Sequence, residues 1–328
     1  MTIPVVYTSG DGRDMGRAYG EAFAGGIHES LRFYRGLKHD PATDLFRYVD
    51  AARAAAPSIA EEIDGMAEGA GISTEEAWWL NCLEEVAEFE ACTTMVQGRW
   101  LMHAEQWYAA HSAVGVVIAH REAGPDFISP TCVGFLPAVG WNSSGFAQGI
   151  DSLYASNERV GVPRVVASRA ALGAPSIDDA IHAACMPGRA GGYAHILASS
   201  SGSAVVETSA TTERVLGDAV AHTNHYLTDP PEGTKRPSRG SASRLARAVE
   251  LLEHEPPLTF EECARLLADH EGDPQSICLH QDGRTAEGTV FGMVCDVATG
   301  RVIVSDGPPC MDRWEEFSLP MSEARLVE

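Results

Sequence analysis

Among the eight cysteines of the sequence, Cys92 is the one whose position indicates chemistry. It follows Glu90-Ala91 at the end of a helical stretch and precedes a predicted strand over 93–97. A thiolate is a strong nucleophile when a base or a lowered pKa activates it. Cleavage of the chain before Cys92 would place a new α-amine, with an ordinary pKa of about 7.7–8.0, beside the thiol as its base. We therefore predict that Cys92 attacks the acyl group of an amide.

Motifs for other chemistries are missing from the sequence. No G-x-G-x-x-G follows a predicted strand, and there is no phosphate-binding P-loop and no G-x-S-x-G turn. No two cysteines have C-x-x-C spacing. His222 and His225 would face opposite ways on a strand, so they do not predict a shared metal. We therefore expect no metal and no cofactor.

Charge and hydropathy exclude several classes of partner. The net charge is −22 with only 24 basic residues, which argues against binding to the phosphates of nucleic acid. No apolar run is long enough to span a membrane, and the N-terminus does not resemble a signal peptide. We expect a cytoplasmic protein with reduced thiols, whose partner is a small molecule; its oligomeric state stays open.

The elements that must position Cys92 change character at this residue. Residues 12–90 read as helical, with a capping box from Ser73 to Glu76. Beyond Cys92, short strands bounded by turn residues dominate, and helices return between them. The expected strands cover 93–97, 114–119, 145–153, 195–198, 204–208, 289–296 and 301–305, and the expected helices cover 164–172, 177–185, 241–253 and 260–269. This order indicates an α+β fold.

Several segments together carry a family resemblance over nearly the whole chain. They are residues 16–21, 61–69, 92–94, 141–145, 222–226, 241–244, 277–280 and 307–310, with Thr289. In these segments the sequence resembles the acyl-CoA:6-aminopenicillanic acid acyltransferase family. Its members are N-terminal-nucleophile hydrolases, related more distantly to choloylglycine hydrolases and penicillin V acylase.

The resemblance implies a four-layer αββα sandwich that cleaves itself before Cys92. The two chains, a helical segment of residues 1–91 and a catalytic body of residues 92–328, would stay together. The Cys92 thiolate would attack the acyl carbonyl while its α-amine takes and returns the proton. Asn224 would donate an N–H to the oxyanion, and Arg244 would hold the surroundings of the nucleophile electrostatically.

The resemblance also names residues with lesser or open roles. Asn142 either assists catalysis or only fixes its turn. For substrate binding we expect four residues, namely His103, Glu105, Trp107 and Trp141.

Three positions depart from the family pattern. Ala104 and Gln106 replace an asparagine and an aspartate, and that aspartate normally contacts the amine of the nucleophile. Gln106 can accept a hydrogen bond through its carbonyl oxygen, but it cannot stabilise an ammonium by charge. Ala91 replaces the usual glycine before the cysteine, which restricts the backbone of the scissile bond.

Three functions therefore remain open at the level of sequence. The first is hydrolysis of a small N-acyl amine or N-acyl amino acid. The second is an acyltransferase that passes the acyl group from Cys92 to an amine acceptor, as in natural-product tailoring. The third is an uncleaved, non-catalytic binding protein on the same fold, which the departures at Ala104 and Gln106 favour.

Overall fold

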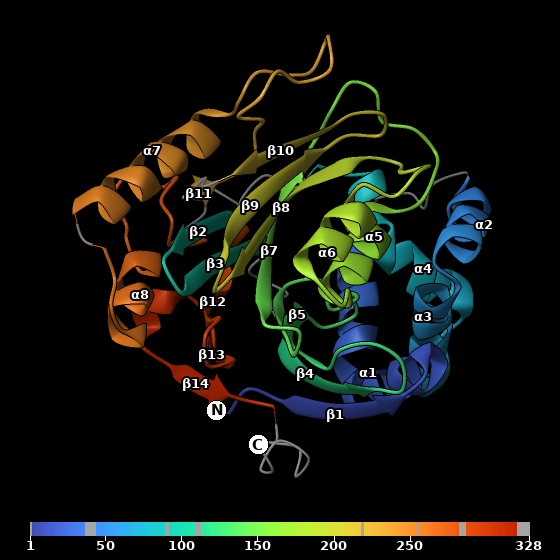
Figure 1. Ribbon diagram of the computed structural model, residues 1–328. Helices are drawn as coiled ribbons and strands as arrows, with labels where there is room; N and C mark the ends of the chain where they lie inside the picture. Colours follow the sequence, from blue (N-terminus) through green and yellow to red (C-terminus); the bar gives the residue numbers. More distant parts are fainter. Residues whose placement is uncertain are drawn as a thin grey trace.

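The chain folds into two facing β-sheets with helices on both outer faces (Figure 1). This computed structural model describes residues 2–36, 44–88, 92–108, 113–217, 220–254, 256–281 and 287–319. From left to right in Figure 1, the layers are α7 with α8, the sheet around β2 and β3, the sheet around β7 and β8, and the remaining helices. The expected four-layer αββα arrangement is confirmed.

Fourteen strands form the two sheets of the described chain. The first sheet has the order β1(Val5–Gly10), β4(Val114–Arg121), β5(Phe127–Cys132), β6(Gly140–Asn142), β7(Phe146–Leu153), β8(Gly192–Ser199), β9(Gly202–Thr208) and β10(Glu213–Gly217). The second has the order β11(Ala221–His222), β2(Thr93–Gln97), β3(Trp100–Tyr108), β12(Glu287–Asp296), β13(Arg301–Ser305) and β14(Trp314–Phe317). Neighbouring strands are antiparallel except β1 and β4, which are parallel.

Helices cover the outer face of each sheet. The α-helices are α1(Gly12–Gly36), α2(Leu45–Ala55), α3(Pro57–Ala70), α4(Thr74–Asn81), α5(Arg164–Leu172), α6(Ile177–Ala184), α7(Arg239–His254) and α8(Phe260–Leu267), and two short 3₁₀ helices are η1(Leu83–Glu85) and η3(Pro309–Met311). Helices α1, α5 and α6 pack on the first sheet, whereas α7 and α8 pack on the second. Among the described residues no helix is long and apolar enough to cross a membrane.

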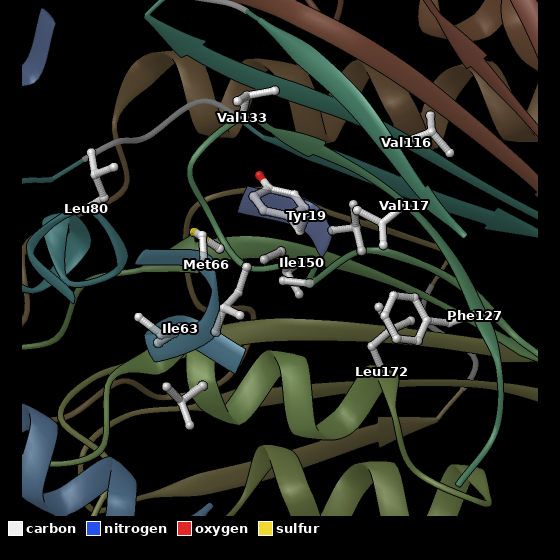
Figure 2. Close-up of a cluster of buried hydrophobic side chains, with 14 of the residues drawn as sticks. Tyr19, Ile63, Met66, Leu80, Val116, Val117, Phe127, Val133, Ile150 and Leu172 are labelled. Carbon is white, nitrogen blue, oxygen red and sulfur yellow. The ribbon is translucent and has the colours of Figure 1, made fainter. Parts of the chain in front are cut away.

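Both faces of the central strands are buried. Every residue of β7 is buried, because one face meets α5 and the other meets β2 and β3 of the second sheet. Figure 2 shows the outer side of the first sheet, where helical residues such as Tyr19, Ile63 and Met66 meet strand residues such as Val117 and Phe127.

Close approach of α1 and α3 depends on glycines spaced four residues apart on each helix. A Cβ atom on Gly16 or Gly20 would lie about 2 Å from a backbone carbonyl of α3, at 1.9 and 2.3 Å respectively. Gly65 and Gly69 meet the carbonyls of α1 in the same way, at 2.2 and 2.1 Å. The two backbones therefore touch directly along this contact.

The segment before Cys92 belongs to the same folded body as the rest of the chain. Its strand β1 forms an edge of the first sheet. Two buried ion pairs also join it to α5, one between Glu62 and Arg169 and one between Glu85 and Arg164. This N-terminal segment therefore supplies one strand of the first sheet and part of the helical layer on its outer face.

Candidate active site

Cys92 lies immediately before β2 and faces a carboxylate on the neighbouring strand β3. Its side chain is buried, with 4% of its surface exposed. Its Sγ donates a hydrogen bond to Oε1 of Glu105 at 3.5 Å. Because β2 and β3 are paired antiparallel, the strand register fixes this contact. The scissile position predicted at Ala91 lies outside the described residues.

The surroundings of Cys92 keep its thiol protonated in the intact chain. Burial raises the pKa of this thiol well above its ordinary value, and the negative charges of Glu105, Asp151 and Glu84 raise it further. A hydrogen bond from the backbone of Gln106 acts in the opposite direction but does not outweigh them. The thiol therefore needs a positive charge or a base before it can act as a nucleophile.

A chain of buried polar groups runs from Glu105 into the space between the two sheets. Nε2 of His103 lies 3.1 Å from Oε2 of Glu105, and its Nδ1 lies 2.8 Å from Oγ1 of Thr94. The Thr94 hydroxyl also donates to Oδ1 of Asp151 on β7 at 3.2 Å. These contacts orient the Glu105 carboxylate and connect the second sheet to the first.

The same network continues through a histidine between two carboxylates. His222 on β11 lies 3.4 Å from Asp151 and 3.1 Å from Glu207 of β9, and all three side chains are buried. Burial by itself would lower the pKa of His222, but its hydrogen bonds with Asp151 and Glu207 outweigh burial and raise the pKa to about 9. His222 is therefore charged near neutral pH, and its ion pairs join the two sheets.

Arg244 contacts both Asn224 and Thr93, the residue that follows Cys92. Arg244, from α7, donates from Nε to the hydroxyl of Thr93 at 3.2 Å and from Nη2 to Oδ1 of Asn224 at 2.7 Å. The Asn224 amide nitrogen donates to the carbonyl of Ser152 at 3.3 Å. Because Arg244 occupies the Asn224 oxygen, the amide N–H groups of Asn224 point away from Arg244.

A cavity of about 60 Å³ opens beside Glu105. Its wall is mostly apolar and includes Trp107, Phe135, Ile150 and Phe291. The indole N–H of Trp107 donates to the hydroxyl of Tyr34, which fixes the ring. Two of the residues predicted for substrate binding, Glu105 and Trp107, thus reach this cavity.

Glu84 also lines this cavity. It comes from η1, before the predicted cleavage position, and accepts hydrogen bonds from Tyr193 at 2.6 Å and Ser152 at 2.7 Å. Burial raises the pKa of Glu84, although Arg164 and these hydrogen bonds oppose the shift. A residue of the N-terminal segment therefore forms part of the candidate site.

A second cavity, of about 130 Å³, lies on the far side of Tyr154, whose hydroxyl donates to Glu84 at 3.4 Å. Its wall includes Asn224 and the basic residues Lys235 and Arg236. Asn224 thus reaches this second cavity, in which Lys235 is paired with Glu88 at 2.7 Å.

Gln106 and Ala104 point away from this side of β3. Side chains alternate along a strand, so these two face the opposite side from Glu105. Ala104 is part of the apolar cluster under α7 and α8. The Gln106 amide nitrogen donates to the carbonyl of Ile277 at 2.6 Å, and its buried oxygen has no hydrogen-bond partner. Glu105, and not Gln106, therefore presents a side chain to the Cys92 thiol.

Two residues predicted for the site make other contacts in the structure. The Asn142 amide nitrogen donates both its hydrogens, to the carbonyls of Leu172 and Ala174, and its oxygen accepts from the backbone of Ser144. Asn142 therefore fixes its turn and has no hydrogen left for an oxyanion. Trp141 packs against Gly300 in the β12–β13 turn, where a Cβ would lie 2.6 Å from its ring. It is not among the described residues that line either cavity.

Sequence reasoning missed Glu84, Asp151, Ser152, Tyr193 and Glu207. Charged residues inside predicted apolar strands would have been a signal for two of them, because Asp151 follows Ile150 and Glu207 follows Val206. Charged side chains are rarely buried unless they are paired.

A separate cluster could hold a metal ion, contrary to the expectation of none. Four residues far from Cys92 in the sequence converge in the described part of the chain, and they are His270, Cys278, His280 and Cys310.

A buried thiol facing a carboxylate between two sheets of an αββα sandwich defines a class of protein suited to covalent acyl chemistry. The sequence model of a family described as acyl-coenzyme A:6-aminopenicillanic acid acyl-transferase matches residues 95–308, well over half of the chain. The chain belongs to this family, and it is therefore a member of an enzyme family that acts on acyl groups. The matched region begins just after Cys92, so the match does not itself include this residue.

Other comparisons give more distant likenesses. A variant of conjugated bile acid hydrolase from Clostridium perfringens has 10% identity, covers 71% of this chain and 99% of its own, and superposes with a TM-score of 0.47. Penicillin V acylase from Agrobacterium tumefaciens has 12% identity, covers 66% and 83%, and gives 0.44. No curated protein matches the chain significantly.

Proposed function

We propose that this protein is an N-terminal-nucleophile amidohydrolase whose nucleophile is Cys92, exposed by self-cleavage of the 91–92 bond. The observation that carries the proposal is the contact between the Cys92 thiol and Glu105 at the wall of an apolar cavity. Membership of the family supports acyl chemistry in general. The amide substrate would transfer its acyl group to Cys92, and water would then release it from the thioester.

Cleavage would supply the base that the intact site lacks. In the intact chain, burial and three carboxylates disfavour the thiolate. A new α-amine on Cys92 would stand beside its own thiol and near Glu105. The amine would accept the thiol proton, and the resulting ammonium would be stabilised by the Glu105 carboxylate. Glu105 would thus replace the carboxylate that is missing at Gln106.

Asn224 is suited to stabilise the oxyanion of the tetrahedral intermediate. Its amide nitrogen carries two hydrogens, so it can serve both the Ser152 carbonyl and an oxyanion. Arg244 holds the Asn224 oxygen and the neighbouring Thr93, which positions the amide before the reaction begins. A donor fixed in this way contributes about 10²–10³ in rate.

The two cavities favour an N-acyl amino acid as substrate. An apolar acyl group suits the cavity that Trp107 lines. The cavity beside Asn224 carries Arg236, which suits the carboxylate of an amino-acid leaving group, and Lys235, whose ammonium is paired with Glu88. A small acyl group fits this first cavity best, since its volume is about 60 Å³.

Acyl transfer to an amine is the second candidate, because the cavity beside Asn224 could equally receive an acceptor. An assay with and without amine acceptors distinguishes the two. Hydrolysis predicts an unchanged rate of acid release and no new amide. New amide that forms only with acceptor would establish the transferase.

The test of the proposal as a whole is the intact mass of the purified protein, with Cys92→Ala as the control. We expect two chains that divide before Cys92 in the natural sequence and one chain in the variant. A thiol-directed acyl probe should label only the natural protein. A single unprocessed chain that resists the probe would establish the non-catalytic alternative instead.

A further inference from the structure

Four potential metal ligands meet on the α8 side of the second sheet, outside the candidate active site. This His-Cys cluster comprises His270, Cys278, His280 and Cys310, and their ligand atoms all lie within 4.8 Å of one another. His270 follows α8, Cys278 and His280 precede β12, and Cys310 belongs to η3. Cys278 is buried, His280 and Cys310 are half-buried, and His270 is exposed, so an ion could enter from solvent.

Three of the six ligand separations in the His-Cys cluster are close to those of a tetrahedral ligand set. Nε2 of His280 lies 3.0 Å from Nε2 of His270, 3.2 Å from Sγ of Cys310 and 3.8 Å from Sγ of Cys278. Zinc binds histidine nitrogen at about 2.0–2.1 Å and cysteine sulfur at about 2.3 Å, so tetrahedral ligands are separated by about 3.3–3.8 Å. These three separations fall within a few tenths of an ångström of this range, and all ligand atoms lie within 4.8 Å of one another.

Hydrogen bonding does not explain this convergence. A neutral imidazole nitrogen either donates one hydrogen or accepts through one lone pair, so Nε2 of His280 cannot satisfy three partners. The rings of His270 and His280 are stacked, with 5.1 Å between centroids and 22° between planes, and both present Nε2 to the same point. A cation between the four atoms would satisfy all of them at once.

We propose that the His-Cys cluster binds one structural Zn²⁺ ion. The two thiols release their protons to solvent on binding, the two histidines bind as neutral imidazoles, and the two thiolates balance the charge of the ion. Two sulfur and two nitrogen ligands in a tetrahedron suit zinc, whereas magnesium and calcium prefer oxygen. All four positions are filled by the protein, which is the pattern of a structural site.

The loop that carries the cluster is already held in place by other contacts. Arg247 of α7 binds Asp269 with Nη2 to Oδ2 at 2.8 Å, and the backbone N–H of Cys278 donates to the Asp269 carbonyl at 2.9 Å. The backbone N–H of Asp273 donates to the carbonyl of His270 at 3.1 Å. Zinc would add a connection that these bonds do not make, between this loop and η3.

The zinc site would also stabilise β3 from the α8 side of the second sheet. Ile277, immediately before Cys278, accepts hydrogen bonds from Gln106 at 2.6 Å and from the Thr289 hydroxyl at 3.3 Å. Gln106 follows Glu105, whose carboxylate faces the Cys92 thiol. The ion would therefore stabilise the strand that carries the active site without taking part in its chemistry.

The test is elemental analysis of the full-length protein, purified without a histidine tag and dialysed against metal-free buffer. We expect one zinc per chain, falling at least tenfold in Cys310→Ser and in His270→Ala. Cys185→Ser and His254→Ala, which change the same residue types outside the cluster, should keep their zinc. Removal of the ion by a chelator should lower the melting temperature of the natural protein and not that of Cys310→Ser.

Replacement of zinc by Co²⁺ gives a second measurement. It requires neither enzymatic activity nor a variant that folds. Tetrahedral Co²⁺ with thiolate ligands absorbs strongly in the visible and near-ultraviolet, and the natural protein should show both bands. Less than a tenth of an equivalent of zinc together with the weak spectrum of octahedral Co²⁺ would overturn the proposal. A disulfide between Cys278 and Cys310 in the protein purified under reducing conditions would overturn it as well.

Discussion

At the scale of single residues, Glu105 has two effects on Cys92 that can be separated. Its charge raises the pKa of the thiol in the intact chain, and it would stabilise the α-ammonium after cleavage. In Glu105→Gln we expect the thiol to be alkylated faster at pH 8 while turnover falls at least tenfold. Alkylation rates against pH, measured on the uncleaved precursor, and steady-state kinetics provide the two readings.

Glu105→Asp is the matched control, because it keeps the charge and shortens the side chain. It should leave the pKa of the thiol nearly unchanged and lower turnover less than Glu105→Gln does. If Glu105→Gln turns over at the natural rate, the carboxylate has no part in the reaction, and Gln106 or the amine alone must suffice.

At the scale of elements, the ion pairs of His222 predict a pH dependence of stability. The folded state raises the pKa of His222 from 6.5 to about 9. A raised pKa contributes stability that is fully present below the unfolded value and is lost as the pH rises through the folded value. We expect the free energy of unfolding to fall by up to about 3 kcal/mol between pH 6 and pH 10 from this group.

Denaturant unfolding at a series of pH values measures this loss of stability. In His222→Gln the free energy of unfolding should change less between pH 6 and pH 10. His254→Gln, at the exposed end of α7, should keep the natural slope. A natural protein whose stability is constant over this range would show that Asp151 and Glu207 do not hold the histidine in its charged form.

The contact between α1 and α3 gives a second prediction at this scale. A Cβ on Gly16 would lie 1.9 Å from the Glu62 carbonyl, whereas a Cβ on Gly25 of the same helix meets nothing within 4 Å. Gly16→Ala should therefore cost about 1–3 kcal/mol through overpacking, and Gly25→Ala should be neutral or slightly stabilising. Thermal unfolding of the pair checks this, and equal melting temperatures would contradict the close contact.

The sequence predicts elements well where local chemistry defines them. The capping box at Ser73 and the helix over 164–172 are found as expected, because caps and apolar spacing act within a few residues. The sequence does not predict β11, which has two residues, or β10, whose residues are mostly exposed. Both strands form because a partner strand pairs with them.

Prediction of the site is limited in the same way, because contacts between strands and sheets bring its residues together. Cys92, Asn224 and Arg244 are indicated by sequence, but the pairing of β2 with β3 is what brings Glu105 to the thiol. Asp151 and Glu207 come from the opposite sheet, so no local pattern could join them to His222. The His-Cys cluster spans residues 270–310, a spacing that resembles no familiar metal motif.

At the scale of the whole molecule, buried ion pairs should hold the two chains together after cleavage. Arg169 of α5 donates from Nε to Oε1 of Glu62 at 3.2 Å, and its Nη2 lies 3.0 Å from Oε2. Arg164 binds Glu85 nearer the cleavage position. Because these pairs and the pairing of β1 with β4 survive a break at residue 91, we expect residues 1–91 and 92–328 to co-elute in native buffer and to separate only in denaturant.

A double-mutant cycle on Glu62 and Arg169 tests how these pairs act. Removing one partner leaves a buried charge without its counterion, which typically costs about 3–5 kcal/mol. Removing both with apolar residues of similar volume relieves that penalty. Arg169→Met and Glu62→Leu alone should each lower stability and loosen the two chains, while the double variant should be more stable than either. If Arg169→Met has no effect on unfolding or on co-elution, the pair does not fasten the N-terminal segment, and other contacts such as the pairing of β1 with β4 must hold it.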